Sequence, residues 1–382
     1  MVTSVAGAGR ADPTATPGPS GTRTVRVGQS EDADPYEAGR AATRAALDLP
    51  EPRLLMVFAS FEYDLARLLA GVAEVAGDVP VIGCSTSGEI GPRPEQANGV
   101  VVVGFGGAFH VTTAYATGLH DGARAVGETV AKALLPLPPT SHRVTVMLTD
   151  SLAGGAGDNL GMVTSRQFHG QRILQDSVVA VSIGTEGPIG LSIRHGWHLR
   201  GDAMVVTGST GNSVHTLDDR PALDVYLDRH AAPAGIEHDP AAFTAFALTR
   251  PMALARRGQV AIRHVLGADP GTRSLICAAS LPKGAAAWLA TGDAAATLAA
   301  ADAACAEAVE ELAGVPLLAL LVFDCAGRRG VLGDDGCVEE RRMMSARAGT
   351  SPLAGFYTYG EIARTRGVNG YHNQTIVALA LS

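Results

Sequence analysis

Two cysteines lie where a thiol can become reactive, and Cys84 is the first of them. It follows the apolar run "VPVIG" and precedes the small polar stretch "STSG". Backbone N–H groups or a helix N-terminus at such a place can lower a thiol pKa and create a nucleophile. The nucleophile elbow Gly-x-Ser-x-Gly is incomplete, because Ser87 stands where its second glycine belongs and no histidine lies near in sequence. We therefore favour a small buried thiol that packs a crowded turn.

Cys325 is the second candidate, in the stretch "FDCAGRRG". Asp324 and Arg328 flank it, so a thiol, a carboxylate and a guanidinium can face one cavity. A guanidinium binds a carboxylate through two parallel hydrogen bonds, which makes Arg328 a candidate for holding a ligand carboxylate. The alternative is a structural ion pair of Arg328 with Asp324 or Glu361.

The stretch "GGAGD" at 154–158 has the glycine content of a phosphate-binding loop. It lacks both the Walker lysine and the GxGxxG spacing, so we predict no nucleotide site. Asp158 can bind a ligand ammonium group and so complement Arg328. Its alternative role is an Asx-turn or a helix cap.

The histidines do not form a metal-binding pattern. His195 and His198 are three residues apart in "RHGWH", and His372 precedes Asn373, but no cysteine or acidic motif accompanies either group. We predict no metal and no cofactor. Asn373, just before the final apolar run, can line a pocket or satisfy backbone groups at a strand end.

An internal repeat joins two of these stretches. "PVIGCSTSGEI" at 80–90 and "PLAGFYTYGEI" at 352–362 align without a gap, and each follows an apolar run that ends in a small polar residue. The two parts of the chain therefore share one design. The identical positions are Pro80 with Pro352, Gly83 with Gly355, Thr86 with Thr358, Gly88 with Gly360, Glu89 with Glu361 and Ile90 with Ile362.

The repeated turn has two interpretations. Glycines tolerate unusual φ values and let backbone N–H groups approach a ligand, which suits the rim of a binding site. Alternatively, the glycines only make a tight turn, and Glu89 and Glu361 cap helices or lie in solvent. Under the first interpretation the two turns lie near one another and a pocket forms between or beside them.

The elements that position these residues alternate between strand and helix. The apolar run 53–60, the helical pattern 63–77 and the run 79–90 predict a sheet buried on both faces and covered by helices. Strand-like segments dominate from residue 100 onward and favour some antiparallel pairing. An Ala-rich pattern over 293–313 predicts a helix of the second half. The predicted fold is mixed α/β, with two related, pseudo-symmetric domains.

Length and composition limit the function classes. The 382 residues suit two domains, which we place at 25–235 and 236–382 after a disordered tail over 1–24. The net charge of −8 and the absence of a basic cluster argue against nucleic acid. Five cysteines without a CxxC pair favour a reducing cytoplasm. No apolar run approaches the roughly 20 residues of a membrane-spanning helix, so we predict no membrane partner.

In their order along the chain, "GCSTSGEI", "GGAGD", "HGW", "FDCAGR", "GFYTYGEI" and "YHNQT" resemble the FIST family over roughly residues 25 to 382. The resemblance implies an intracellular bacterial sensory module that binds small ligands, amino acids among them, and is often joined to signalling domains. One departure is that "VTVMLTDSL" runs directly into "AGGAGD", where relatives carry a further helix and strand. We expect a stand-alone sensor that acts on a separate signalling protein.

The sequence thus predicts ligand sensing, with a small molecule as the partner. Its alternatives are a thiol-dependent acyl-transfer or hydrolase enzyme, which would use Cys84 or Cys325, and a protein-binding scaffold. We predict no catalytic residue. The ligand-binding residues that we expect are Cys84, Ser85, Thr86, Glu89, Asp158, Arg328, Glu361 and Asn373.

Overall fold

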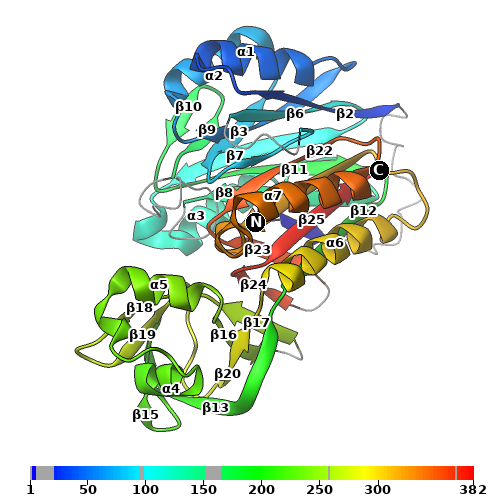
Figure 1. Ribbon diagram of the computed structural model, residues 1–382. Helices are drawn as coiled ribbons and strands as arrows, with labels where there is room; N and C mark the ends of the chain where they lie inside the picture. The colour runs from blue at the N-terminus through cyan, green and yellow to red at the C-terminus, as the bar shows by residue number, and fades with distance from the viewer. Residues whose placement is uncertain (1, 6–20, 94–98, 151–164, 257–258, 366–367) are drawn as a thin grey trace.

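The computed structural model describes residues 2–5, 21–93, 99–150, 165–256, 259–365 and 368–382. The fold is mixed α/β, as the sequence predicts. A body of three sheets carries a smaller lobe, drawn green to yellow at the bottom of Figure 1. Within the described residues, no helix has both the length and the apolar character that crossing a membrane requires.

The first sheet of the body has the order β10-β9-β4-β3-β6-β2, with β3 and β4 parallel. Helices α1 and α2 cover its outer face, at the top of Figure 1. Each helix begins after an aspartate, Asp34 or Asp64, whose carboxylate accepts two backbone N–H groups. The elements are β2 (Arg23–Ser30), α1 (Pro35–Ala46), β3 (Pro52–Ser60), α2 (Leu65–Ala76), β4 (Val81–Thr86), β6 (Val100–Gly107), β9 (Gln167–His169) and β10 (Arg172–Leu174).

The second sheet, of order β12-β25-β21-β22-β5, repeats this design. In chain order it has an edge strand (β12), a helix (α6), a strand (β21), a second helix (α7) and a strand parallel to β21 (β22). The last strand, β25, is antiparallel and lies between β12 and β21. Helices α6 and α7 cover the outer face (Figure 1). The elements are β5 (Glu89–Ile90), β12 (Ile189–Arg194), α6 (Ala294–Glu310), β21 (Ala319–Cys325), α7 (Ala326–Ala348), β22 (Leu353–Thr358) and β25 (Ile376–Leu381).

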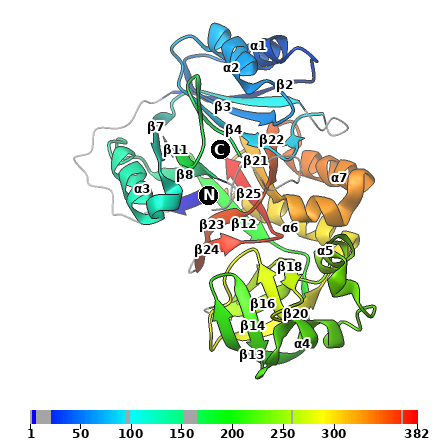
Figure 2. The same cartoon turned by 90° about the vertical axis from the view of Figure 1, so that its left-hand side faces the viewer.

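The third sheet, of order β24-β23-β1-β8-β11-β7, completes the body, and α3 packs on its outer face (Figure 2). The predicted antiparallel pairing occurs here between β11 and both β7 and β8. The predicted tail over 1–24 includes β1, which this sheet contains, and residues 6–20 lie outside the described residues. The elements are β1 (Val2–Val5), β7 (His110–Thr117), α3 (Leu119–Ala133), β8 (His142–Thr149), β11 (Ser177–Thr185), β23 (Glu361–Thr365) and β24 (Val368–His372).

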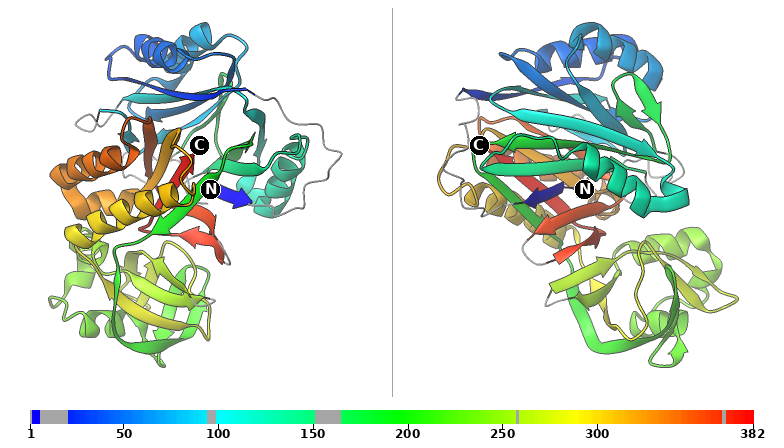
Figure 3. Two further views of the ribbon diagram at one scale, coloured as in Figure 1. Left: turned by 90° about the vertical axis from the view of Figure 1, so that its right-hand side faces the viewer. Right: turned by 180° about the vertical axis from the view of Figure 1, so that it is seen from behind.

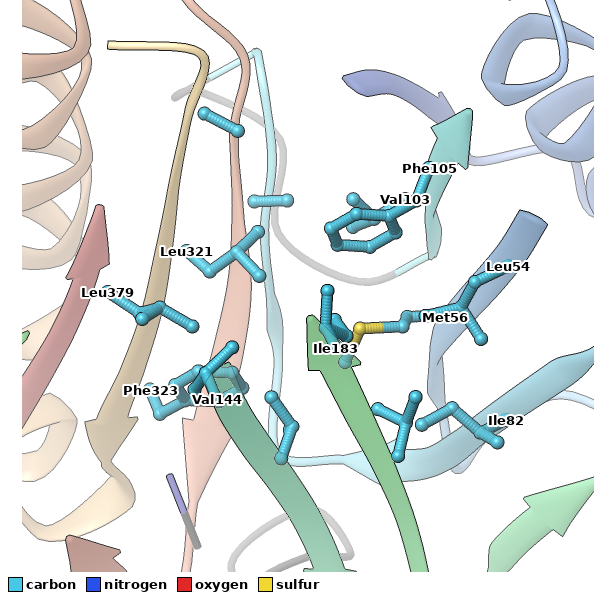
Figure 4. Close-up of a cluster of buried hydrophobic side chains, with 14 of the residues drawn as sticks. Leu54, Met56, Ile82, Val103, Phe105, Val144, Ile183, Leu321, Phe323 and Leu379 are labelled. Carbon is cyan, nitrogen blue, oxygen red and sulfur yellow. The ribbon is translucent and has the colours of Figure 1, made fainter. Parts of the chain in front are cut away.

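All three sheets turn their inner faces toward one shared apolar core (Figure 4). Leu54 and Met56 of β3 point into it, whereas Leu55 and Val57 between them face α1 and α2. Strands β21 and β25 alternate in the same way between the shared core and helices α6 and α7. Burial on both faces explains why these strands are continuous apolar runs in the sequence.

The lobe is a separate sheet, of order β17-β16-β20-β13-β14-β19-β18, with its own apolar core. The chain enters it after β12 and returns to the body at α6, so the lobe is inserted into the second repeat (Figure 3). The elements are β13 (His198–Thr210), β14 (Ser213–Leu217), β15 (Arg220–Pro221), α4 (Ala222–Arg229), the 3-10 turn η2 (Ile236–His238), α5 (Pro240–Leu248), β16 (Met252–Arg256), β17 (Gln259–Arg263), β18 (Val265–Asp269), β19 (Ser274–Cys277) and β20 (Ala286–Thr291).

The spatial units differ from the predicted sequence domains. Residue 236 lies between α4 and α5, and the lobe core contains Tyr226 and Phe243 from both sides of it. The repeated units are instead 23–107 and the combination of 189–194 with 294–382. The domains 25–235 and 236–382 therefore do not coincide with compact bodies, because the lobe core is continuous across their boundary.

Two glycines of the repeat are required by close backbone packing. Gly83 lies opposite Val57 in the parallel pair β3–β4, and Gly355 lies opposite Val322 in β21–β22. A Cβ atom at Gly83 would lie 2.0 Å from the carbonyl oxygen of Val57, and one at Gly355 would lie 1.7 Å from that of Val322. No side chain fits at either position, which explains the identity of this residue in both copies.

We expect Gly83→Ala and Gly355→Ala each to lower the free energy of unfolding by at least about 2 kcal/mol, because the backbone must move to admit the methyl group. Gly127→Ala in α3 is the matched control, since its Cβ would meet no atom within 4 Å. This control should be neutral or stabilise the protein by up to about 1 kcal/mol. Urea unfolding measures all three, and equal values would contradict the packing argument.

Candidate functional site

The two copies of Thr-x-Gly-Glu form the same hydrogen-bonded turn. In the second copy the Thr358 hydroxyl donates to Glu361 Oε1 (2.7 Å) and accepts from the Gly360 N–H (3.0 Å). In the first copy the Thr86 hydroxyl is hydrogen-bonded to Glu89 and accepts from the Gly88 N–H (3.3 Å). The repeat therefore extends from the sequence to the side-chain contacts.

The second carboxyl oxygen of each glutamate is also bonded. Glu89 Oε2 accepts from the Gly99 N–H (2.8 Å), and Glu361 Oε2 accepts from the Thr375 hydroxyl (2.7 Å). Both side chains are buried, with exposed fractions of 1% and 3%. The interpretation that these glutamates cap helices or lie in solvent is therefore wrong. Each one fastens its turn to the segment that leads into the next strand.

Burial sets the protonation of both carboxyl groups. Desolvation raises the pKa of Glu89 to about 8, although Thr86, Gly99 and Arg329 oppose the shift. Desolvation likewise raises the pKa of Glu361 to about 7, against the hydrogen bonds from its threonines. The carboxyl groups thus titrate near neutral pH, because water is excluded from them.

The first turn lies directly against the second repeat. Its Gly88 carbonyl accepts from the Tyr357 N–H (2.8 Å), and the Ser87 N–H donates to the Tyr357 carbonyl (3.2 Å). Arg329, in the first turns of α7, donates to the Ser87 carbonyl and lies over the Tyr357 ring, 5.8 Å from its centroid. Backbone pairing therefore fills the space between this turn and β22.

Arg328 lies at the centre of a buried polar network between β21, α6 and α7. Its Nε donates to Asp324 Oδ1 (2.5 Å), and its Nη2 donates to Glu340 Oε1 (2.6 Å) and to the Thr297 carbonyl (3.0 Å). The Tyr357 hydroxyl also donates to Glu340 (3.2 Å). Burial alone would lower the pKa of Arg328, but the two carboxylates raise it above its ordinary value. The structural ion pair with Asp324 is therefore present.

Some polar atoms at this end of the second sheet have no hydrogen-bond partner among the described residues. They are Arg328 Nη1, Asp324 Oδ2, Asn373 Oδ1 and Gln374 Oε1. All four side chains are at most 2% exposed. A buried donor or acceptor without a partner is costly, and it indicates a group that another molecule can satisfy.

Gln374 connects this region to the lobe. Its Nε2 donates to the Leu248 carbonyl at the end of α5 (2.9 Å) and lies 3.0 Å from His264 Nδ1 in the lobe. The backbone carbonyl of Gln374 accepts from Trp197 Nε1 (3.1 Å), and Trp197 lies where the chain enters the lobe. Burial lowers the pKa of His264 to about 4, so this imidazole is neutral at pH 7 and can accept the amide proton. The motifs "HGW" and "YHNQT" therefore meet at the joint between lobe and body.

The two candidate thiols are buried and protonated. Desolvation raises the pKa of both Cys84 and Cys325 well above the ordinary value for cysteine. A nucleophilic thiol needs the opposite shift, toward the thiolate. The geometry therefore agrees with the packing role favoured for Cys84 and extends it to Cys325.

The structure separates the predicted site residues into two groups. Arg328, Glu361 and Asn373 lie at one end of the second sheet, near Gln374, which contacts the lobe, whereas Thr86 and Glu89 form the first turn and Ser85 accepts from the Arg166 N–H (3.0 Å). Asp158 lies outside the described residues. Sequence reasoning missed four residues, although Arg329 and Gln374 directly adjoin predicted ones. They are Thr297, Arg329, Glu340 and Gln374.

The lobe also contains a surface hollow of about 360 Å³, between the end of α4 and η2. None of the predicted site residues lines it, and its walls come from the segment 227–237. It has no buried, unpaired charge of the kind found at the joint. We therefore place the candidate site at the joint.

Two family models match the chain in sequence. Residues 53–220 match the FIST N domain, and residues 222–364 match the FIST C domain. The change from one match to the other falls inside the lobe, between β15 and α4. Together the matches cover the lobe and most of both repeats, whereas β2, α1 and β25 lie outside them.

Similar proteins are described as uncharacterized. One from Mycobacterium tuberculosis is 28% identical over 218 residues, which is 55% of each chain. One from Mycobacterium bovis is 29% identical over 256 residues, which is 63% of this chain and 62% of the relative. The matched part thus spans less than two thirds of either relative. Among solved structures, T. maritima PurL complexed with AMPPCP aligns over 94% of this chain and 73% of that chain, at 11% identity and a TM-score of 0.25, which supports no argument.

Replacing Glu89 by glutamine should stabilise the protein increasingly as the pH rises. The pKa of Glu89 is raised from 4.5 to about 8, so its stabilising contribution is complete below pH 4.5 and is lost as the pH rises through 8. Glutamine is neutral throughout, and it can accept from the Gly99 N–H through its oxygen while its amide N–H donates to the Thr86 hydroxyl. We expect the difference in unfolding free energy between variant and wild type to grow by up to about 1.4 kcal/mol per pH unit in this window.

Glu361→Gln is the companion variant, and its gain should level off near pH 7. Urea unfolding between pH 4.5 and pH 9 measures both. A difference that stays constant with pH would contradict the protonated state of these glutamates.

Alkylation tests the state of the thiols. At neutral pH the folded protein should react with iodoacetamide at Cys84 and Cys325 at least about a hundredfold more slowly than the urea-unfolded chain, because reaction requires opening of the core. Mass spectrometry of tryptic peptides gives the rate at each site. Rapid labelling of either cysteine in the folded protein would support the thiol-enzyme hypothesis instead.

Proposed function

The chain belongs to the FIST family, and from this premise we propose that it is a small-ligand-binding sensory protein of intracellular signal transduction. Its ligand is an amino acid or a similar metabolite, bound at the joint between lobe and body. Domains of this family are associated with sensory roles in signal transduction, which supports the proposal. The output passes to a separate signalling protein.

One observation carries the proposal, namely the unpaired donor and acceptor in the Arg328 network. Arg328 Nη1 can donate to a ligand carboxylate, and Asp324 Oδ2 can accept from a ligand ammonium group. Burial raises the pKa of Asp324 well above its ordinary value; Arg328 opposes the shift, and the neighbouring carboxyl group of Glu340 adds to it. A cationic ligand group beside Oδ2 would favour the ionised carboxylate. A zwitterion of amino-acid size supplies both partners.

Selectivity would come from the amide side chains beside this pair. Asn373 Oδ1 and Gln374 Oε1 are acceptors without partners among the described residues, so they suit further N–H or O–H groups of a ligand. A site that is built to hydrogen-bond such groups discriminates strongly against analogues that lack them. We therefore propose a polar ligand rather than an apolar one. The buried, protonated thiols argue against the thiol-enzyme alternative.

A thermal-shift screen of amino acids and related metabolites tests the proposal. A ligand that binds only the folded state stabilises it by about 2.7 kcal/mol at a hundred times its Kd, so the Tm should rise with ligand concentration. Asp324→Asn keeps the shape and the Oδ1 acceptor but cannot carry a negative charge. We expect it to abolish the shift that the same compound gives with wild type.

Arg347→Lys is the matched control, because Arg347 lies at the far end of α7 and pairs with the partly exposed Asp302 of α6. It should keep the full shift. If Asp324→Asn unfolds, Asn373→Ala tests the same site from the connection between β24 and β25 and should reduce the shift. If a compound still stabilises both site variants, the ligand binds at a different site. If no compound in the panel stabilises the protein, the proposed ligand class is contradicted.

A further inference from the structure

The first two turns of α7, Ala326–Leu332, contact both repeats of the body; we call them the coupling segment. Arg328 joins β21 to α6 through the Asp324 and Thr297 contacts. Arg329, the next residue, donates to the Ser87 carbonyl in the first Thr-x-Gly-Glu turn. Of two adjacent arginines in one segment, Arg328 therefore contacts the candidate site and Arg329 contacts the first repeat.

The coupling segment also carries the contact with the lobe. A Cβ atom at Gly330 would lie only 3.0 Å from the Leu248 side chain at the end of α5. Val331 packs against the buried cluster of Trp197, Ala253 and Ile262, of which the last two lie on β16 and β17. A shift of the segment along or about its axis would therefore change the packing of the lobe.

The segment is separated from the rest of α7 by a break in the helix. Gly333 has φ 65° and ψ −178°, which is not helical, inside the 23-residue element. It is exposed, and a Cβ at this position would meet no atom within 4 Å. Packing at Gly333 itself therefore does not select this conformation, and described contacts that cross the break include the Arg328–Glu340 pair and the contact of Cys337 Sγ with the Arg329 carbonyl.

The lobe itself is attached in a way that permits movement as a body. The chain crosses between body and lobe twice: it enters the lobe through Gly196 and Trp197, and it leaves through Gly292. Its core is distinct from the shared core of the body and from the clusters beneath the body helices. Beyond these connections, described contacts run through Gln374, through the coupling segment, and between β17 of the lobe and β24 of the body.

We propose that the coupling segment transmits the state of the Arg328 network to the orientation of the lobe, with Gly333 as its pivot. A ligand that hydrogen-bonds to Arg328 Nη1 and Asp324 Oδ2 shifts the coupling segment, and the lobe reorients because Gly330 and Val331 pack against it. The assignment of a ligand to this network rests on the proposed function. The mechanical link between segment and lobe does not, so it is tested on the full chain without ligand.

The test is hydrogen–deuterium exchange of two glycine variants. Gly333→Ala adds a methyl group in open space but disfavours the left-handed φ, so it acts on the pivot alone. We expect exchange at the body-facing peptides of the lobe, residues 243–250 and 260–265, to rise about tenfold. Gly349→Ala is the control, because Gly349 has φ 62°, the same open space and no lobe contact, at the other end of α7.

Arg329→Ala provides an independent arm, since Arg329 touches the body and not the lobe. It should raise exchange at the same lobe peptides, and Arg329→Lys should restore part of the protection. The proposal is overturned if Gly333→Ala and Gly349→Ala give the same exchange map, or if the Arg329→Ala effect is confined to β5 and β22. Because no ligand is present, neither result depends on whether the proposed metabolite binds.

Discussion

The guanidinium of Arg328 is completely buried, and its charge has to be neutralised where water cannot reach it. That requirement determines how β21, α6 and α7 meet, because Asp324, Glu340 and the Thr297 carbonyl must all come within hydrogen-bond distance of one side chain. The network in turn fixes the start of α7, on which the contacts to the first repeat and to the lobe depend. Removing one partner would leave an uncompensated charge in the core.

Much of the body could be predicted from local pattern. The apolar runs that became β3, β4, β21 and β22 are buried on both faces, so their continuous hydrophobicity indicates a covered sheet. The identical positions of the repeat also indicate equivalent turns, and the structure gives Glu89 and Glu361 equivalent contacts. The sequence pattern could not predict that these glutamates are buried, because their desolvation depends on segments far away in the chain.

Helix α7 and the lobe show why the rest was missed. Four glycines, at 327, 330, 333 and 336, interrupt the apolar periodicity of α7 and lower its helix propensity, yet packing against β21 and β22 overrides that preference. The lobe alternates strands and helices like the body, so nothing local marks it as an insertion. In the candidate site, Arg328 and Asn373 were predicted from residue type, but Gln374 was not, since its role depends on the lobe that it contacts.

The pairing of β12 with β25 has a consequence for synthesis of the protein. Residues 189–194 form an edge of the second sheet only when residues 376–381 arrive beside them, and the whole lobe is translated in between. The first sheet, strands β7, β8 and β11 and the lobe all precede α6 in the chain, whereas the second sheet cannot form until residues 376–381 are made. The side of the shared core that β21 and β25 cover therefore stays open until the last residues of the second sheet have been made.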